Sequence, residues 1–500
     1  ISVMKKIKML LLLAVAVIVA SCGKQQGPSP MSMIPEDAAM VMSVNMKSLI
    51  DKSGIEVKDG QVIFPDSYSS LLQNLSASDK GELDGLAESG VDFEGRAYLF
   101  VNSSDFQVGL IVPIKDKEAF KGYVEKVDES TMTADGEEYY KCVDGRMVQL
   151  ISDYYFGVFE MKGTSDEATC KAVMSGTLEK PISTKKSAVK ALDGGNDIMA
   201  WINYEGLMSM ASGSSMSAAA MLQGGMLASV INSVDGVSGT LDFNKKSIDL
   251  VAKTIYKEGT DVIANFEQIY GKASAEGLKF IPNDVEAVMS LTMNGENILK
   301  INEISNLLLQ YKDNAMLSRD ELRDYIAGID GPVTIGMNYS SLIYNKYSVP
   351  AIYGAIKNKN CEKIFAKVES LLRGMGFPVM KNGDEIVVNF RDASSVAVGC
   401  KDGFLYFRTS GAPVTKSMYD DSQAREIMES ASCGLYVPVK DGSSVQRILT
   451  TLDPALKISG YASACSSTEE STMSIVVDSP ENDNIIITLL SVIAQSQLAK

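Results

Sequence analysis

Histidine is absent from the 500-residue sequence. Imidazole is the base of Ser-His-Asp and Cys-His catalysis, a ligand of zinc and the side chain that titrates near neutral pH. Its absence excludes these catalytic arrangements, His-ligated zinc and imidazole pH switches. The G-x-S-x-G, Walker A, G-x-G-x-x-G and EF-hand patterns are also missing, so no metal or other cofactor is predicted.

Basic and aromatic residues are scarce. The 47 lysines and arginines are outnumbered by 63 aspartates and glutamates, which gives a formal net charge of −16. Because phosphate binding requires clustered cations, the composition argues against a nucleic-acid partner. Trp201 is the only tryptophan and aromatic residues make up 7% of the chain, so a platform for stacking sugars is not indicated.

The first apolar run of the chain is short. It covers residues 9–19 and follows a basic stretch at residues 4–8, which is the arrangement of a secretory signal peptide. A run of about eleven residues cannot span a bilayer, since a spanning helix requires about 20. The N-terminus is therefore predicted to be an export signal.

The segment Val19-Ala20-Ser21-Cys22 resembles the lipobox of bacterial lipoproteins. The resemblance implies that residues 1–21 are removed and that the Cys22 thiol carries a diacylglycerol, which would hold the chain to a membrane. The alternative is an ordinary secretory signal that happens to contain a cysteine. Residues 22–33 are polar, contain Gly, Pro and Ser, and are predicted to form a flexible tether.

The remaining chain contains an internal repeat. Residues 34–46 recur at residues 281–293 with seven identities in thirteen positions. Further matches follow in the same order, namely 113–117 with 355–359, Asp153 with Asp402, Trp201 with Tyr436, and 238–239 with 459–460. So long a period predicts a domain duplication rather than a solenoid. The predicted units are residues 34–280 and residues 281–500.

Each unit mixes strand and helix patterns. Residues 247–256 alternate apolar and polar side chains, as a half-buried strand does. Helical periodicity is predicted at residues 69–88, 116–127, 166–174, 205–232 and 260–272. Strands joined by tight turns imply antiparallel pairing. The predicted fold class is therefore α+β, with two tandem homologous units, each an antiparallel sheet with helices packed on one face.

Six cysteines follow Cys22, and none forms a C-x-x-C pair. They lie at positions 142, 170, 361, 400, 433 and 465. None falls opposite another cysteine in the repeat, so a disulfide shared by the two units is not predicted. An exported chain permits disulfides. Buried free thiols are favoured, and one pair within the second unit is the alternative.

Catalytic patterns are weak. Ser187 and Lys190 form an S-x-x-K pattern, the nucleophile pair of penicillin-binding enzymes, but the partner motifs of that family lie upstream instead of downstream. Asp37 and Asp284 recur at equivalent positions after Ile-Pro-x, which suits a turn or capping role better than catalysis. No catalytic residue is predicted.

Residues 206–234 are the one segment of the sequence that suggests a binding role. They contain no charge, and five methionines lie among them, at Met208, Met210, Met216, Met221 and Met226. Unbranched, polarizable methionines suit adaptable apolar surfaces, so these residues are a candidate partner-binding element. The alternatives are a helix packed on its own sheet, which the sequence favours, and a helix lying on a membrane.

The lipobox and the Ile-Pro-x-Asp segments at residues 34–37 and 281–284 make the chain resemble a family of uncharacterised Bacteroidetes lipoproteins of about this length. The resemblance implies an outer-membrane lipoprotein and no known activity. Residues 23–26 carry no acidic side chain, whereas surface-exported lipoproteins of that phylum often do. Their absence favours the periplasmic face over the cell surface.

Two functions follow from these features. The favoured hypothesis is a non-enzymatic envelope lipoprotein that binds a partner protein or a small molecule. The alternative is a hydrolase that uses two carboxylates to act on envelope glycan or peptidoglycan, since such chemistry requires no histidine. A cleft between the two lobes that is lined by close carboxylates and several aromatic side chains would support the hydrolase, and a flat or apolar cleft would support binding.

Overall fold

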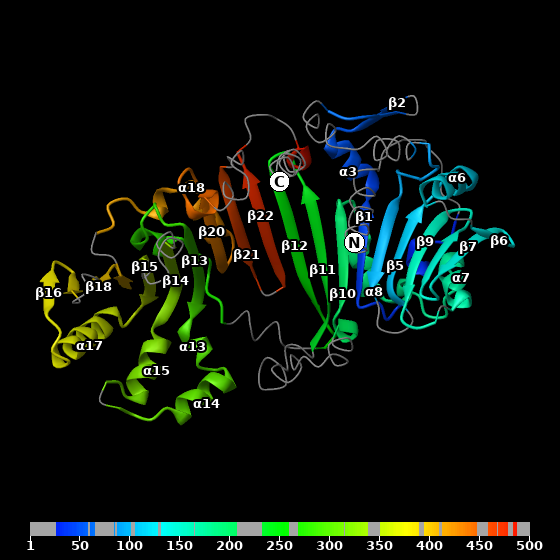
Figure 1. The fold of residues 1–500 in the computed structure, drawn as a ribbon. Coiled ribbons are helices and arrows are strands. Elements are labelled where there is room, and N and C mark those ends of the chain that lie inside the picture. Colours follow the sequence, from blue (N-terminus) through cyan, green and yellow to red (C-terminus); the bar gives the residue numbers. More distant parts are fainter. Residues whose placement is uncertain are drawn as a thin grey trace. The chain divides into compact units, whose positions relative to one another are not determined.

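The computed structural model describes residues 27–58, 61–65, 85, 88–101, 106–128, 132–164, 166–207, 233–259, 269–314, 316–338, 351–389, 395–409, 413–447, 459–467, 469–478 and 484–487. The chain forms two compact units (Figure 1). Unit 1 comprises Ile1–Gly224, Asn232–Lys257 and Ser479–Lys500, and unit 2 comprises Gly225–Ile231 and Glu258–Asp478. The sequence repeat instead places the boundary after residue 280.

Unit 1 is built mainly from strands. Its strands are β1 (Met40–Asn45), β2 (Glu56–Lys58), β3 (Gln61–Ile63), β4 (Arg96–Val101), β5 (Phe106–Pro113), β6 (Thr133–Asp135), β7 (Glu138–Val143), β8 (Met147–Ile151), β9 (Tyr155–Met161), β10 (Ile198–Asn203), β11 (Val234–Phe243) and β12 (Ser247–Tyr256). Its helices are α2 (Pro30–Met33), α3 (Met46–Ser53), α6 (Lys117–Asp128), α7 (Glu167–Ser175), the 3-10 turn η2 (Ile182–Thr184) and α8 (Lys186–Leu192).

Unit 2 has the same character. Its strands are β13 (Ala287–Asn294), β14 (Ile329–Asn338), β15 (Ala351–Asn358), β16 (Val379–Asn382), β17 (Glu385–Asn389), β18 (Ser395–Lys401), β19 (Phe404–Arg408), β20 (Cys433–Val439), β21 (Gly460–Ser466) and β22 (Glu470–Val477). Its helices are η3 (Glu276–Phe280), α13 (Gly295–Ile298), α14 (Asn302–Gln310), α15 (Arg319–Ala327), α17 (Cys361–Gly374), η4 (Met418–Asp420) and α18 (Ser422–Ser430).

The strand order is the same in both units. In unit 1 the antiparallel neighbours run β12-β11-β10-β1-β4-β5-β9-β8-β7-β6. In unit 2 they run β22-β21-β20-β13-β14-β15-β19-β18-β17-β16. The pairing register also corresponds, because Val41 lies opposite Trp201 in unit 1 and Val288 lies opposite Tyr436 in unit 2.

The cores follow from this order. In unit 1, alternate side chains of β9, among them Tyr155 and Phe159, join a cluster that also contains Trp201 and residues of α7 and α8. A second cluster contains Phe120 of α6 and Val112 of β5. In unit 2, η3, η4 and α18 cover Val288 and Tyr436. Short helices therefore cover parts of each sheet.

The predicted α+β class is wrong, because strands dominate the fold. Twenty strands belong to antiparallel sheet. The prediction missed β6 and β7, whose side chains are mostly half-buried or exposed and give little apolar signal. Backbone pairing, not an apolar face, holds such strands in the sheet. The helices that accompany them are short, with α17 at 14 residues the longest of those described.

The folded part begins earlier than predicted. Pro30–Met33 form α2, although residues 22–33 are predicted to be a tether. Met33 is fully buried, and Met31 packs against the same core cluster. The Tyr155 hydroxyl donates to the Pro28 carbonyl at 2.8 Å. Burial of these apolar side chains offsets the entropy of ordering the segment, so any tether is shorter than predicted.

Candidate functional site

Two groups of residues singled out in the sequence lie outside the described residues. They are Cys22, the predicted site of lipidation, and the five methionines Met208, Met210, Met216, Met221 and Met226. Both remain predictions.

The S-x-x-K pattern has an ordinary structural role. Ser187 lies in α8, and its hydroxyl donates to the Asp235 carboxylate at 2.6 Å. Lys190 is exposed on the same helix. Asp37 and Asp284 lie exposed in turns, which are closed by bonds from Ala38 N to Pro35 O at 3.2 Å and from Val285 N to Pro282 O at 3.4 Å.

A polar pocket of about 390 Å³ lies in unit 2, where α18 begins and β20 ends. It is lined by Asp421, Gln423, Tyr436, Val439, Lys440, Asp441, Ser459, Gly460, Tyr461 and Asp478. The sequence analysis missed this site. These residues span 58 positions of the chain, and only the pairing of β20, β21 and β22 brings them together.

Two tyrosines form the aromatic part of the pocket. The rings of Tyr436 and Tyr461 have centroids 5.5 Å apart and are tilted by 44°. Tyr436 is only 2% exposed, and its hydroxyl donates to the Asp421 carboxylate at 3.3 Å. Burial, aided by the charge of Asp421, raises the pKa of Tyr436 above its ordinary value. The Tyr436 hydroxyl therefore stays protonated and acts as a hydrogen-bond donor to Asp421.

Asp421 is held by its own helix. Its carboxylate accepts the backbone N–H groups of Gln423 at 3.1 Å and Ala424 at 3.2 Å, as an N-cap does. The Lys440 ammonium lies 3.8 Å from the same carboxylate. With the Tyr436 hydroxyl, four donors surround this group and hold the Asp421 carboxylate in place at the start of α18.

The pocket carries an excess of negative charge. Asp421, Asp441 and Asp478 line it together with one cation, Lys440. Asp441 and Asp478 are exposed at its rim, and neither has an ion-pair partner among the described residues. No cluster of three or more His, Cys, Asp or Glu that could hold a metal ion occurs in the described part of the chain. The pocket is thus acidic and aromatic.

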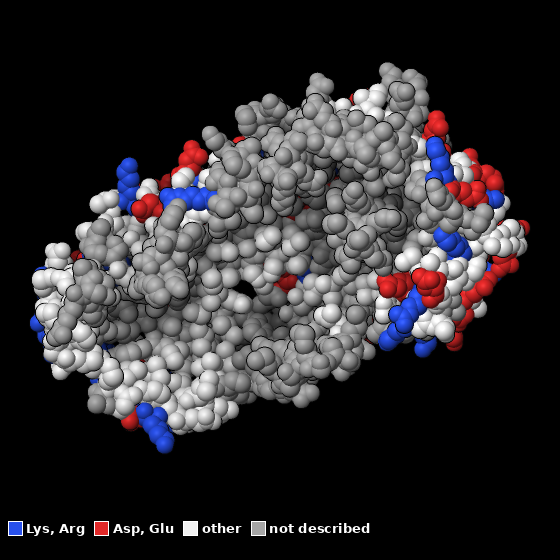
Figure 2. All heavy atoms as spheres, in the orientation of Figure 1, with Lys and Arg blue, Asp and Glu red and all other residues white. Residues whose placement is uncertain are grey.

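Elsewhere the surface charge is mixed. Figure 2 shows acidic and basic side chains side by side in the region of α6, α7 and β6–β9. The Lys117–Asp153 ion pair there measures 2.7 Å. No continuous basic patch is visible on this face among the residues that are described.

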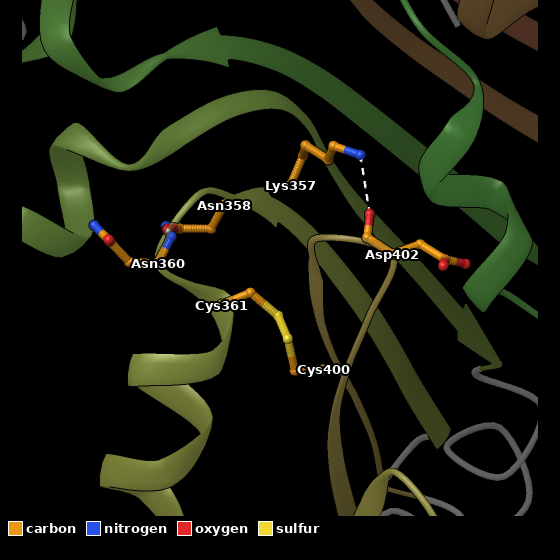
Figure 3. Close-up of a disulfide and its surroundings, with 6 residues drawn as sticks. All are labelled: Lys357, Asn358, Asn360, Cys361, Cys400 and Asp402. Carbon is orange, nitrogen blue, oxygen red and sulfur yellow. Dashed lines mark hydrogen bonds between the residues drawn. A yellow bond between two sulfur atoms is a disulfide. The ribbon is translucent and has the colours of Figure 1, made fainter.

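A disulfide joins Cys361, the first residue of α17, to Cys400 of β18 (Figure 3). Their Cα atoms are 5.8 Å apart, within the range of unstrained disulfides. The bond agrees with the alternative prediction, one cysteine pair within the second unit, and not with the favoured prediction that all six cysteines are free thiols. The bond is flanked by Asn358, whose side chain accepts the Asn360 N–H at 2.8 Å, and by Lys357, which donates to the Asp402 carbonyl at 3.0 Å. Cys142, Cys170, Cys433 and Cys465 form no disulfide with another described cysteine.

No described helix is both long and apolar enough to cross a membrane. No curated protein sequence matches the chain. Among solved structures, crystal form I of TP0453 is similar at a TM-score of 0.28 and 9% identity, covering 47% of this chain and 82% of that one. Crystal form III of TP0453 has a TM-score of 0.25 and 7% identity, with 46% and 81% covered.

The sequence profile of one family, described as a domain of unknown function (DUF4836), matches residues 31–431. The matched residues include unit 1 from residue 31 to the end of β12 and the larger part of unit 2. They end before β20, so most of the pocket lining lies beyond them. Because the match covers more than half of the sequence, the chain belongs to the DUF4836 family.

Proposed function

We propose that this protein is a lipid-anchored lipoprotein of the outer membrane, facing the periplasm, whose unit 2 pocket binds a small molecule without converting it. The anchor and address rest on residues 4–22 and on the resemblance to Bacteroidetes lipoproteins. The observation that carries the binding role is the pocket itself, which Tyr436 and Tyr461 line together with Asp441 and Asp478, two carboxylates without an ion-pair partner among the described residues.

The disulfide supports export. Disulfides persist in oxidising compartments such as the bacterial periplasm and are rare in the reducing cytosol. The Cys361–Cys400 bond is therefore consistent with a chain that leaves the cytosol.

Binding is favoured over hydrolysis by the state of Asp421. Carboxylate hydrolysis requires one group that donates a proton and a second that attacks or activates water. Asp421 is the least exposed carboxylate of the pocket, and its oxygens accept from a helix N-terminus and from Tyr436. Asp441 and Asp478 lie at the open rim, where water competes for both. The pocket suits recognition better than bond cleavage.

We also propose that the two units arose by duplication. The support is the identical order of ten paired strands and the shared register of Val41 with Trp201 and Val288 with Tyr436. Convergence on one order over so many strands is improbable, because many antiparallel orders satisfy the same physical rules.

Replacement of Cys22 tests the anchor. Cys22→Ala is expected to abolish incorporation of a radiolabelled fatty acid, because no other atom at that position can form the thioether. Cys142→Ser, which replaces a cysteine of β7 far from residue 22 in the sequence, should label like the unmodified chain. Undiminished labelling of the Cys22→Ala protein would show that Cys22 is not the site of lipid attachment.

The methionine-rich residues 206–234 are a second proposed partner-binding element. If they bind an envelope protein, mild peroxide should oxidise Met208, Met210, Met216, Met221 and Met226 faster than the buried Met33 and Met174. Peptide mass spectrometry after timed oxidation measures the rates. Equal protection of both groups would exclude this element as an exposed binding surface.

A further inference from the structure

We infer that the unit 2 pocket binds a primary alkylammonium group, as carried by a small amine. The inference rests on the proposed binding role and adds the chemical class of the ligand. It comes from comparing the pocket with the equivalent place in unit 1, where the protein binds an ammonium group of its own.

The equivalence of the two places follows from backbone geometry. Lys185 is the single residue between η2 and α8, and Asp421 is the single residue between η4 and α18. Trp201 lies opposite Val41 as Tyr436 lies opposite Val288. The Trp201 ring lies near Lys185, and the Tyr436 hydroxyl lies near Asp421.

In unit 1 a lysine completes the site. The Lys185 ammonium lies 5.5 Å from the centre of the Trp201 ring, within the range of cation–π attraction. It also lies 3.4 Å from the Asp235 carboxylate and 3.4 Å from the Asn203 side-chain oxygen. An aromatic face and a carboxylate thus hold a primary ammonium group at this place in the fold.

In unit 2 the equivalent residues differ. Asp421 stands where unit 1 has Lys185. The strand register places Gly460 where unit 1 has Asp235, and Pro438 where unit 1 has Asn203. The aromatic face is supplied by Tyr436 and Tyr461. Carboxylates are supplied by Asp441 and Asp478, which have no internal cation to pair with among the described residues.

The residues packed beside the aromatic residue also differ. The Trp201 ring lies so close to Gly236 that a Cβ atom there would come within 2.2 Å of it. The counterpart of Gly236 is Tyr461, since each lies two residues before the partner of its aromatic residue, Ser238 or Ser463. The pocket beside the two tyrosines of unit 2 measures about 390 Å³, near the lower end of ligand-pocket volumes.

A neighbouring ion pair also differs. In unit 1 Lys257 and Glu205, which follow β12 and β10, are 2.8 Å apart. In unit 2 Asp478 follows β22 and Lys440 follows β20. The acidic and the basic residue have therefore exchanged places relative to unit 1. The Lys440 ammonium lies 3.8 Å from the Asp421 carboxylate. Asp478 therefore remains available to accept N–H donors from a ligand. This favours a primary ammonium over a quaternary one, which cannot donate.

Calorimetric titration of the detergent-solubilised protein tests the inference. The probes are n-butylammonium, choline, n-butanol and butyrate, which vary the charge and the N–H donors at similar size. We expect n-butylammonium to bind at least tenfold more tightly than choline, and butanol and butyrate to bind too weakly to measure. Raising the salt concentration should weaken the binding of n-butylammonium, because the rim carboxylates are exposed.

Variants locate the binding. Asp478→Asn and Tyr461→Leu should each weaken n-butylammonium binding at least tenfold, and Tyr461→Leu keeps an apolar side chain so that folding is retained. Glu429→Gln removes one charge from the exposed surface of α18, outside the pocket, and should change the affinity less than twofold. Equal effects of Asp478→Asn and Glu429→Gln would show general charge attraction and would overturn the site.

The outcomes separate this inference from the proposed function. If butanol or butyrate binds as tightly as n-butylammonium and depends on Tyr461, the ammonium preference is wrong and the pocket still binds small molecules. If none of the four probes binds, both the ammonium preference and the binding role of this pocket are wrong.

Discussion

Removal of the Cys361–Cys400 disulfide is expected to lower the free energy of unfolding of unit 2 by about 4 kcal/mol. The bond closes a loop with a sequence separation of 39, and its loss enlarges the conformational freedom of the unfolded chain. Urea unfolding followed by circular dichroism, with and without a reductant, measures the change. The double variant Cys361→Ser, Cys400→Ser should match the reduced protein.

The single tryptophan provides a control for this experiment. Trp201 is buried in unit 1, so its fluorescence reports the unfolding of that unit. Reduction should leave the midpoint of the fluorescence transition unchanged while it shifts the circular dichroism transition. An unchanged circular dichroism midpoint on reduction would show that the disulfide does not stabilise the fold.

Asp197→Ala is expected to destabilise unit 1 by about 3 kcal/mol. The Asp197 carboxylate is fully buried. It accepts from Lys52 Nζ at 2.7 Å, from Ser48 Oγ at 2.5 Å and from the backbone N–H of Phe243 at 2.6 Å. Its removal leaves a partly buried ammonium and two further donors without their acceptor, which costs more than the loss of a surface pair.

The fluorescence of Trp201 measures this effect directly, because Trp201 lies in β10, which begins immediately after Asp197. Asp135→Ala serves as the comparison, since it breaks the exposed Asp135–Lys171 pair and should destabilise the unit much less, because water screens an exposed pair. If the two substitutions shift the urea midpoint equally, the buried network does not stabilise the unit.

Local patterns explain most of what the sequence predicted correctly. Alternation at residues 247–256 identified β12 with its observed ends. The apolar spacing and the acidic start at residues 166–174 identified α7, whose N-cap Asp166 accepts from Ala168 N at 3.0 Å. Such features depend on neighbours in the chain, which is why they can be read without the fold.

Register could not be obtained in this way. The sequence repeat matches residues 238–239 with residues 459–460, whereas the strand pairing places Ser238 opposite Trp201 and Ser463 opposite Tyr436. A bulge between Val234 and Gly236 shifts the pairing of β11 with β12. The two matches differ by four residues, and only the hydrogen bonding between strands shows which residues are equivalent.

The sequence by itself determined the signal-like N-terminus, the exclusion of histidine chemistry and the recurrence of an Ile-Pro-x-Asp segment before two equivalent strands. Only the tertiary structure decided that strands dominate, that Cys361 pairs with Cys400, and that Asp421 and Asp478 share a pocket with two tyrosines. Composition and periodicity reflect the secondary structure and the solvent exposure of each residue, which depend on its neighbours in the chain. Distances between remote residues are set by sheet pairing and burial, which act across the whole unit.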